Sequence, residues 1–394
     1  MKNTCPKMPE RVLHISYGSG VLGGAIRFAI NYYKYINQKL VIFDFLFCNR
    51  NSLKMLENDT LLDNSKIFEL NCFEHGMNIR SYLSLISNIR RILKDNNYMI
   101  VHVDSGSLPI QICCLFACRL EKVKVRIAHS HSMGDINKEK SVKSIIKYLA
   151  KPIMQGIIRI LATDYFACSN VAGENLFGKR GIKSPRYKQI HNAIEVDRFR
   201  YDVAKREEIR DFAQIDKDTV VFGHVGRFDK AKNHLFLLDV FDEIYKRNSN
   251  TKLWIIGDGD LRKAIEKKLS ALESKQNVLL YGEKNNVSDM LQGIDALIFP
   301  SIYEGLSIVC VEAQTSGLQI FASQNISEEH NITGNVYFIS LELSAVEWAE
   351  YILQKIDPLE RKDMSTIIEE NGYSLSKEGK KLEDLYINMR ERYA

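Results

Sequence analysis

Residues 219–233 read TVVFGHVGRFDKAKN, and their pattern indicates the fold class. Its first seven residues are rich in β-branched and aromatic side chains, which is typical of a buried strand. A basic turn containing a glycine follows, and the apolar positions of residues 235–246 then recur at helical spacing. Parallel sheets are built from strands that lead through a turn into a helix. The stretch therefore predicts an α/β protein with a parallel sheet.

The same unit recurs along the whole chain. In the second half we expect strands at residues 219–225, 253–256, 278–281, 296–299 and 319–322. In the first half we expect them at residues 11–17, 41–48, 98–103, 123–128 and 164–168. Two such series predict two Rossmann-like parallel-sheet domains. The expected divisions are an N-terminal domain (1–194), a C-terminal domain (195–374) and a charged terminal helix (375–394) that packs back on the N-terminal domain.

Composition excludes several classes of protein. Of the 394 residues, 45% are hydrophobic and 26% are charged, as in ordinary globular proteins. No apolar run approaches the roughly 20 residues of a membrane-spanning helix, and residues 1–11 lack the apolar segment of a signal peptide. The eight cysteines show no CxxC spacing, which argues against structural zinc. We therefore expect a cytoplasmic protein with reduced, buried thiols.

Charge is divided unevenly along the chain. The net charge is +5, but residues 1–192 carry +14 and residues 193–394 carry −9. A basic domain can face an anionic bilayer, a phosphorylated ligand or nucleic acid. Residues 138–159, KEKSVKSIIKYLAKPIMQGIIR, predict a pair of basic amphipathic helices that suits an anionic membrane surface. Packed helices with solvated lysines are the alternative.

The basic turn at residues 226–233 follows a strand, where open parallel sheets bind their ligands. Arg227 and Lys232 can bind phosphate oxygens, and the N-terminus of the next helix adds backbone donors. Together they could neutralise a diphosphate without a metal. A solvated basic turn is the alternative interpretation.

Residues 300–313, PSIYEGLSIVCVEA, follow another expected strand. Glu304 in the loop and Glu312 in the next helix can each accept hydrogen bonds from a hydroxyl of a sugar or a ribose. The alternative is a pair of surface glutamates. The backbone N–H groups at the start of that helix can face an anion; they belong to Gly305, Leu306 and Ser307.

Two motifs follow expected strands in the first half. Residues 18–24, GSGVLGG, match Gly-x-Gly-x-x-Gly, but no acidic residue follows the second strand at the ribose position. We expect a loop whose backbone approaches a phosphate or a sugar, rather than a nicotinamide site. His129 and His131 come at the end of another strand, where they could contact a substrate or move a proton. A metal is not expected there, because only Asp135 lies close enough in the sequence to complete a site.

Taken together, these motifs resemble the family 4 glycosyltransferases of GT-B fold, in particular the bacterial capsular and exopolysaccharide members. The two glutamates of residues 300–318 are separated by seven residues, a spacing that is specific when a GRF…K motif precedes it. The other matching segments are GG (23–24), RIAHSH (126–131), ACS (167–169), HNAIEVDRF (191–199), GRFDKAKN (226–233) and IGDG (256–259).

The resemblance implies two domains that face a central cleft and a retaining sugar transfer that needs no metal or other cofactor. The donor would be a nucleotide-sugar, usually UDP-linked, and the acceptor a hydroxyl of a glycan or of a polyprenyl-diphosphate-linked oligosaccharide in surface polysaccharide biosynthesis. A peripheral position on the inner face of the membrane would suit that acceptor.

The resemblance also implies roles for individual residues. Arg227 and Lys232 would bind the donor diphosphate, and Glu312 would bind the ribose. Glu304 would hold the donor sugar together with the backbone of Gly305, Leu306 and Ser307. Gly23 and Gly24 would border the diphosphate and the acceptor. One of His129 and His131 would touch the donor sugar near the reacting carbon, and His131 is the better match, because the family's usual single histidine ends such a strand.

The sequence also allows two other functions. The first is a nucleotide-sugar epimerase on the same fold. The second is a non-catalytic binder of glycans or nucleic acid, although base stacking needs exposed aromatic side chains among the basic ones, a pattern that the sequence does not show. The chain departs from the family pattern at Ala193 and Gln319, where glycine and proline are usual. These departures leave the donor sugar, the acceptor and the linkage undefined.

Overall fold

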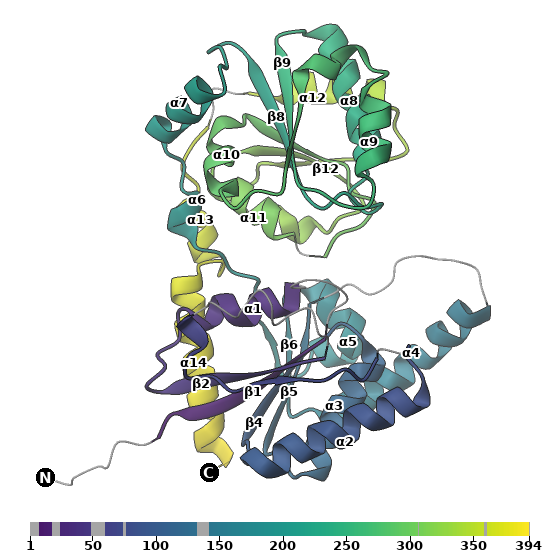
Figure 1. Cartoon of the computed structure of the whole chain (residues 1–394), viewed down its shortest axis with the longest axis vertical. Helices are drawn as coiled ribbons and strands as arrows, with labels where there is room; N and C mark the ends of the chain where they lie inside the picture. The colour runs from purple at the N-terminus through teal and green to yellow at the C-terminus, as the bar shows by residue number, and fades with distance from the viewer. Residues whose placement is uncertain are drawn as a thin grey trace, which may run out of the picture. The chain divides into compact units, whose positions relative to one another are not determined.

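The computed structural model describes residues 8–17, 24–48, 60–73, 76–131, 142–305, 307–357 and 361–393. The chain forms two compact units. Unit 1 comprises Met1–Ala193 and Leu375–Ala394, and unit 2 comprises Ile194–Ser374. Each unit contains one parallel sheet with helices on both faces (Figure 1). The predicted α/β class with two Rossmann-like parallel-sheet domains is confirmed.

Unit 1 has a seven-stranded sheet in the order β3-β2-β1-β4-β5-β6-β7. Its strands are β1 (Glu10–Ser16), β2 (Val41–Phe47), β3 (Ile67–Glu69), β4 (Ile100–Asp104), β5 (Val125–Ser130), β6 (Asp164–Ala167) and β7 (Tyr187–Gln189). The sheet grows from β1 to one side and then restarts with β4 on the other, so the order reverses between β1 and β4. Strands β3 and β7 were not predicted; they have three residues each and are only partly buried.

Helices cover both faces of this sheet. One face is covered by α2 (Ile79–Asn96), α3 (Leu108–Leu120), α4 (Val142–Leu161) and α5 (Asn170–Ile182). The other is covered by α1 (Gly24–Tyr33) and by the terminal helix α14 (Leu375–Tyr393), which packs on α1 and β2 (Figure 1). Because strand side chains alternate, Leu13 faces the first group of helices and Val12 the second.

Unit 2 has a six-stranded sheet in the order β10-β9-β8-β11-β12-β13, and its order reverses between β8 and β11. Its strands are β8 (Val220–Val225), β9 (Thr251–Ile256), β10 (Val278–Gly282), β11 (Ala296–Phe299), β12 (Gln319–Ser323) and β13 (Val336–Ile339). One face carries α6 (Val196–Phe199), α7 (Val203–Phe212), α10 (Val287–Gly293), α11 (Ile308–Thr315) and α13 (Ser365–Glu370). The other carries α8 (His234–Arg247), α9 (Arg262–Leu269) and α12 (Ala345–Lys355).

Two local expectations need correction. His129 lies inside β5 rather than beyond it, because the strand pairs with β6 as far as Ser130. From Val142 onwards the basic segment forms one helix, α4, which continues through Pro152 rather than splitting into a pair. Its buried residues Ile158 and Leu161 hold it against the core. Within the described ranges, no helix combines the length and the apolarity that crossing a bilayer requires.

Candidate functional site

The reversal of strand order in unit 2 brings two charged groups together. Lys232 follows β8 and Glu304 follows β11, the two neighbouring strands at the reversal. The Lys232 ammonium contacts the Glu304 carboxylate and lies 4.9 Å from the centre of the Phe299 ring. The Ser301 hydroxyl donates to the same carboxylate at 3.2 Å. Ligands of open α/β sheets bind at this kind of position.

Arg227 lies in the same turn but is held less tightly. Its side chain is 62% exposed, and its guanidinium is 3.5 Å from the carboxylate of the exposed Asp260. An exposed ion pair of that length contributes little to stability. The guanidinium can therefore turn towards an anionic ligand at small cost.

The loop after β9 sets the position of the basic turn. The Gly226 N–H donates to Ile256 O at 3.0 Å, and the Phe228 N–H donates to Asp258 O at 2.9 Å. Gly257 has φ +142°, and a Cβ added there would lie 2.0 Å from the Gly226 carbonyl oxygen. The two loops meet backbone to backbone, so only glycine fits at position 257.

Glu312, the second glutamate of the motif, is half-buried on α11, whose N-cap is Ser307. The Ser307 N–H, which was expected to face an anion, donates to His330 Nε2 at 2.9 Å. Burial lowers the pKa of His330, and its Nδ1 bonds to Ser327 O at 2.8 Å. His330 is therefore a neutral acceptor at the start of α11, and the sequence carried no signal for it.

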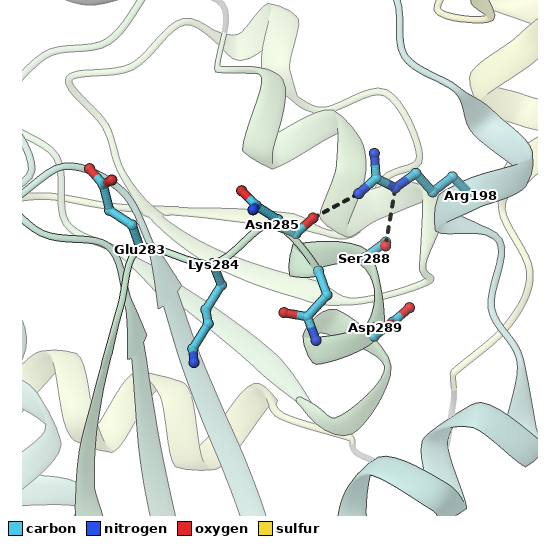
Figure 2. A pocket seen from close by; sticks show the side chains of 7 residues that line it. Arg198, Glu283, Lys284, Asn285, Ser288 and Asp289 are labelled. Atoms are coloured by element: carbon cyan, nitrogen blue, oxygen red, sulfur yellow. Dashed lines mark hydrogen bonds between the residues drawn. The ribbon is translucent and has the colours of Figure 1, made fainter. Parts of the chain in front are cut away.

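A pocket of about 670 Å³ opens at the carboxyl end of β10 in unit 2 (Figure 2). Arg198 lies at one side of it and donates to Asn285 O at 2.9 Å and to the Ser288 hydroxyl at 3.3 Å. This pocket was not predicted, although the polar loop after the expected strand at residues 278–281 was an available signal. The lining residues are Arg198, Glu283, Lys284, Asn285, Asn286, Ser288 and Asp289.

In unit 1, a group of polar side chains lies on the sheet face covered by α1 and α14. The parallel register places His14 beside His102 and Asp104 beside His129, and His131 follows β5 directly. Strand alternation turns all five side chains to the same face. The Asp104 carboxylate lies 2.8 Å from His14 Nδ1, 3.0 Å from His131 Nε2 and 3.4 Å from His129 Nδ1.

Burial controls the charge of this group. It lowers the pKa of His129 to about 3 and the pKa of His102 well below its ordinary value, so both rings are neutral at pH 7. Burial opposes ionisation of Asp104, but the surrounding imidazoles outweigh it and hold the pKa of its carboxyl well below the usual value. The cluster therefore contains an ionised carboxylate among imidazole rings.

His129 and His131 were predicted from the sequence, but Asp104, whose carboxylate contacts both rings, was not. Asp104 comes from β4, 27 positions before His131, whereas Asp135 lies outside the described residues. A signal was present, because His102 and Asp104 occupy alternate positions of an otherwise apolar strand. Of the predicted glycines, Gly24 begins α1 and Gly305 precedes α11. Gly23 and Leu306 lie outside the described residues.

Three of these groups have the spacing of metal ligands. In the described part of the chain, the ligand atoms of His102, Asp104 and His129 form the one such group, all within 4.8 Å of one another. His102 Nε2 and His129 Nδ1 lie 3.0 Å apart, which is a hydrogen-bond distance. A proton shared between the two rings accounts for their approach.

Comparison with known proteins identifies the family and the fold. Residues 205–372 match the family described as glycosyl transferases group 1. The UDP-Gal:alpha-D-GlcNAc-diphosphoundecaprenol alpha-1,3-galactosyltransferase of Escherichia coli is 26% identical over 324 residues, which are 79% of this chain and 80% of that protein. The crystal structure of Anabaena Alr3699/HepE in complex with UDP has a TM-score of 0.73 at 14% identity, covering 96% of this chain and 100% of that one.

Sequence identity is higher with another bacterial protein, the putative glycosyltransferase EpsF of Bacillus subtilis. The two chains are 30% identical over 345 residues, which are 87% of each. This likeness reaches well beyond the segment that matches the family. Identity at this level over most of both chains shows that the chain belongs to the glycosyl transferases group 1 family and is a glycosyltransferase of GT-B fold.

Proposed function

We propose that the chain transfers a sugar from a UDP-sugar to a hydroxyl of a glycan or a polyprenyl-diphosphate-linked acceptor in surface polysaccharide biosynthesis. The observation that carries the proposal is the Lys232–Glu304 contact at the strand reversal of unit 2, beside the exposed Arg227. It joins a phosphate-binding cation to a hydroxyl-binding carboxylate. The E. coli relative, by its name, uses UDP-Gal and a diphosphoundecaprenol acceptor, and the HepE structure holds UDP, which supports this donor and acceptor class.

The proposed donor spans the carboxyl edge of the unit 2 sheet. Its diphosphate lies on Arg227 and Lys232, and a hydroxyl of its sugar donates to Glu304. The backbone of Gly305 lies along the same sugar, and Glu312 on α11 binds the ribose. The pocket at the end of β10 has polar walls and room for the base.

The proposed transfer needs no metal and no other cofactor. As the bond between the sugar carbon and the diphosphate oxygen breaks, negative charge collects on the leaving diphosphate. Arg227 and Lys232 stabilise that charge from fixed positions, which is the part that a metal ion plays in other phosphate chemistry. The acceptor hydroxyl attacks from the side of the leaving group and gives its proton to the leaving phosphate, so the anomeric configuration is retained.

The first test separates a transferase from an epimerase. Purified protein is incubated with UDP-sugars, alone and with a diphospholipid-linked oligosaccharide, and the products are identified by mass spectrometry and NMR. The proposal is supported if UDP release depends on the acceptor and the oligosaccharide gains one sugar. The new glycosidic bond should have the same anomeric configuration as the UDP-sugar. Conversion of the UDP-sugar without any acceptor would favour the epimerase. Turnover that persists undiminished in EDTA supports the metal-free mechanism, and loss that Mg²⁺ restores contradicts it.

The double variant Arg227→Ala, Lys232→Ala tests the site itself. It should lose turnover and lose the thermal stabilisation that UDP gives to the wild-type protein. Normal turnover by this variant would refute the placement of the diphosphate. A parallel screen with GDP and GDP-sugars tests the choice of base, because the preferred nucleotide gives the largest shift at equal concentration.

We also propose that α4 rests on an anionic membrane surface. Its apolar side chains Leu149, Ile153 and Ile160 are 67%, 68% and 71% exposed. Spacings of four and seven residues place them on one side of the helix. The first 192 residues carry a net charge of +14, and each basic residue near an anionic bilayer contributes about 1 kcal/mol. The occupant of this apolar face is thus an anionic bilayer, which also carries a polyprenyl-linked acceptor.

A further inference from the structure

With neutral imidazole rings and an ionised Asp104, one arrangement of protons satisfies every contact in the buried cluster of unit 1. We call it the Asp104 cluster, and it comprises His14, His102, Asp104, His129, His131 and Tyr386. Tyr386 comes from α14, and the other five come from the edge where β1, β4 and β5 end. Proton positions follow from which atoms face each other, because a neutral imidazole has one donor and one acceptor nitrogen.

The first part of the arrangement surrounds Tyr386. Its hydroxyl lies 3.3 Å from His14 Nε2 and 2.6 Å from His102 Nδ1. His14 Nδ1 faces Asp104 Oδ2 at 2.8 Å, and an ionised carboxylate can only accept, so Nδ1 is the donor nitrogen of the neutral His14 ring. His14 Nε2 then accepts the one proton of the Tyr386 hydroxyl, and His102 Nδ1 donates to that hydroxyl.

The second part extends to the histidines of β5. With its proton on Nδ1, His102 accepts at Nε2 from His129 Nδ1 at 3.0 Å. His131 Nε2 lies 3.0 Å from Asp104 Oδ1, and an ionised carboxylate can only accept, so this nitrogen carries a proton. In the neutral ring the lone pair of His131 is therefore on Nδ1.

That lone pair has no partner within the described part of the chain. His131 Nδ1 is buried without a hydrogen bond, although buried polar atoms nearly always have one. The ring is also held from the side, because Phe28 of α1 lies 4.9 Å from it between ring centres. His129 Nε2 is also buried without a hydrogen bond among the described residues. The His129 side chain is fully buried, however, whereas His131 retains 6% exposure at the end of the strand.

We propose that Asp104 is a positioning residue for His131: it holds the Nε2–H of the ring, so that the Nδ1 lone pair accepts a hydrogen bond from a hydroxyl of a sugar substrate. This inference rests on the proposed transferase function and assigns the sugar contact to His131 rather than His129. The other tautomer would present an N–H to the hydroxyl and leave the carboxylate facing a lone pair. Asp104 thereby selects the one tautomer that can accept.

The test is the variant Asp104→Asn, which is almost equal in size but can donate a hydrogen bond. The amide oxygen of Asn keeps the bond from His14 Nδ1, because the His14 tautomer is set by the chain through Tyr386 and His102. The amide N–H then faces His131 Nε2, reverses the His131 tautomer and leaves Nδ1 protonated. With ¹⁵N-histidine labelling, NMR distinguishes the two tautomers directly, and comparison with His131→Gln identifies the signals of His131 among the nine histidines. We expect the Nε2–H form in the wild type, the Nδ1–H form in Asp104→Asn, and a fall in kcat of about tenfold or more.

The affinity for UDP should not change in Asp104→Asn, because UDP lacks the sugar that is transferred and its proposed contacts are in unit 2. The matched control is Asp44→Asn. Asp44 is a buried carboxylate of β2 that accepts from Arg11 Nε at 2.8 Å and Tyr98 Oη at 2.7 Å, outside the cluster. The Asp44→Asn variant should lower the stability of the fold while leaving the His131 tautomer and kcat as in the wild type.

Three results would overturn the inference. They are a wild-type His131 in the Nδ1–H form, a tautomer that Asp104→Asn does not change, and a fall in kcat that Asp44→Asn reproduces. If Asp104→Asn does not fold, the wild-type spectrum decides alone. If the wild type has no transferase activity, the proposed function fails, while the tautomer measurement still supports or overturns the role of Asp104.

Discussion

The ammonium of Lys232 contacts the carboxylate of Glu304, although the two residues are 72 positions apart in the chain. Their strands, β8 and β11, are neighbours because the sheet of unit 2 reverses its order there. Each group holds the other in place before a donor arrives, and neither charge is left unpaired in a partly buried position. The Lys232 ammonium is therefore already oriented before a diphosphate binds.

Lys232→Ala should therefore weaken UDP binding by about 10- to 100-fold, since a charge-assisted hydrogen bond contributes about 1.5–3 kcal/mol. Isothermal titration calorimetry with UDP measures the change. Lys230→Ala is the matched control, because Lys230 is an exposed lysine of the same turn. Equal losses in the two variants would mean that only the general charge of the turn matters.

Gly257→Ala should destabilise unit 2 and weaken UDP binding, because its Cβ would displace the Gly226 carbonyl and the basic turn behind it. Gly334→Ala is the control: Gly334 also has a positive φ, +84°, but an added Cβ meets nothing within 4 Å. We expect Gly334→Ala to cost about 1 kcal/mol in backbone strain and Gly257→Ala at least about 2 kcal/mol more. Thermal unfolding and UDP titration of both variants give the comparison. Similar values for the two would show that the contact between the loops is not tight.

Acid should destabilise the protein through its buried histidines. Burial lowers the pKa of His234 to about 4, so the folded state binds fewer protons than the unfolded state below pH 6.5. Stability is therefore complete above pH 6.5 and falls as the pH drops towards 4, by about 2 kcal/mol at pH 5 for this one group.

His234→Leu removes that titration while keeping an apolar side chain against Phe228. Urea unfolding at pH 7 and pH 5 should show a smaller loss on acidification in the variant than in the wild type. The same pH dependence in both proteins would rule out His234 as a contributor.

The exposed apolar side of α4 should bind anionic vesicles. The wild-type protein should float with phosphatidylglycerol vesicles and not with phosphatidylcholine vesicles, and the triple variant Leu149→Ser, Ile153→Ser, Ile160→Ser should stay in solution. The control is Phe212→Ser, which removes a side chain of unit 2 that is even more exposed. Recovery of the wild type in equal amounts with both lipids would contradict the membrane proposal.

Local patterns predicted much of the fold correctly. The strands of 219–225 and 296–299 and the helix of 235–246 agree with β8, β11 and α8 to within one residue at each end. These elements are long, or apolar enough to be buried, so their periodicity is visible in the sequence. Elements such as β3 and β7 were missed because a three-residue, half-exposed strand exists only through its pairing with a neighbour.

Strand and helix periodicity and turn composition are local properties, so the α/β class, the presence of two sheets and the residue types after each strand could be predicted from the order of residues. Which of those residues meet depends on how the strands are arranged in the folded protein. Strand order placed Lys232 on Glu304, parallel register placed Asp104 beside His129, and α14 returned from the end of the chain to bring Tyr386 to His102. Those contacts join positions far apart in the chain, and only the order and register of the strands bring them within hydrogen-bonding distance.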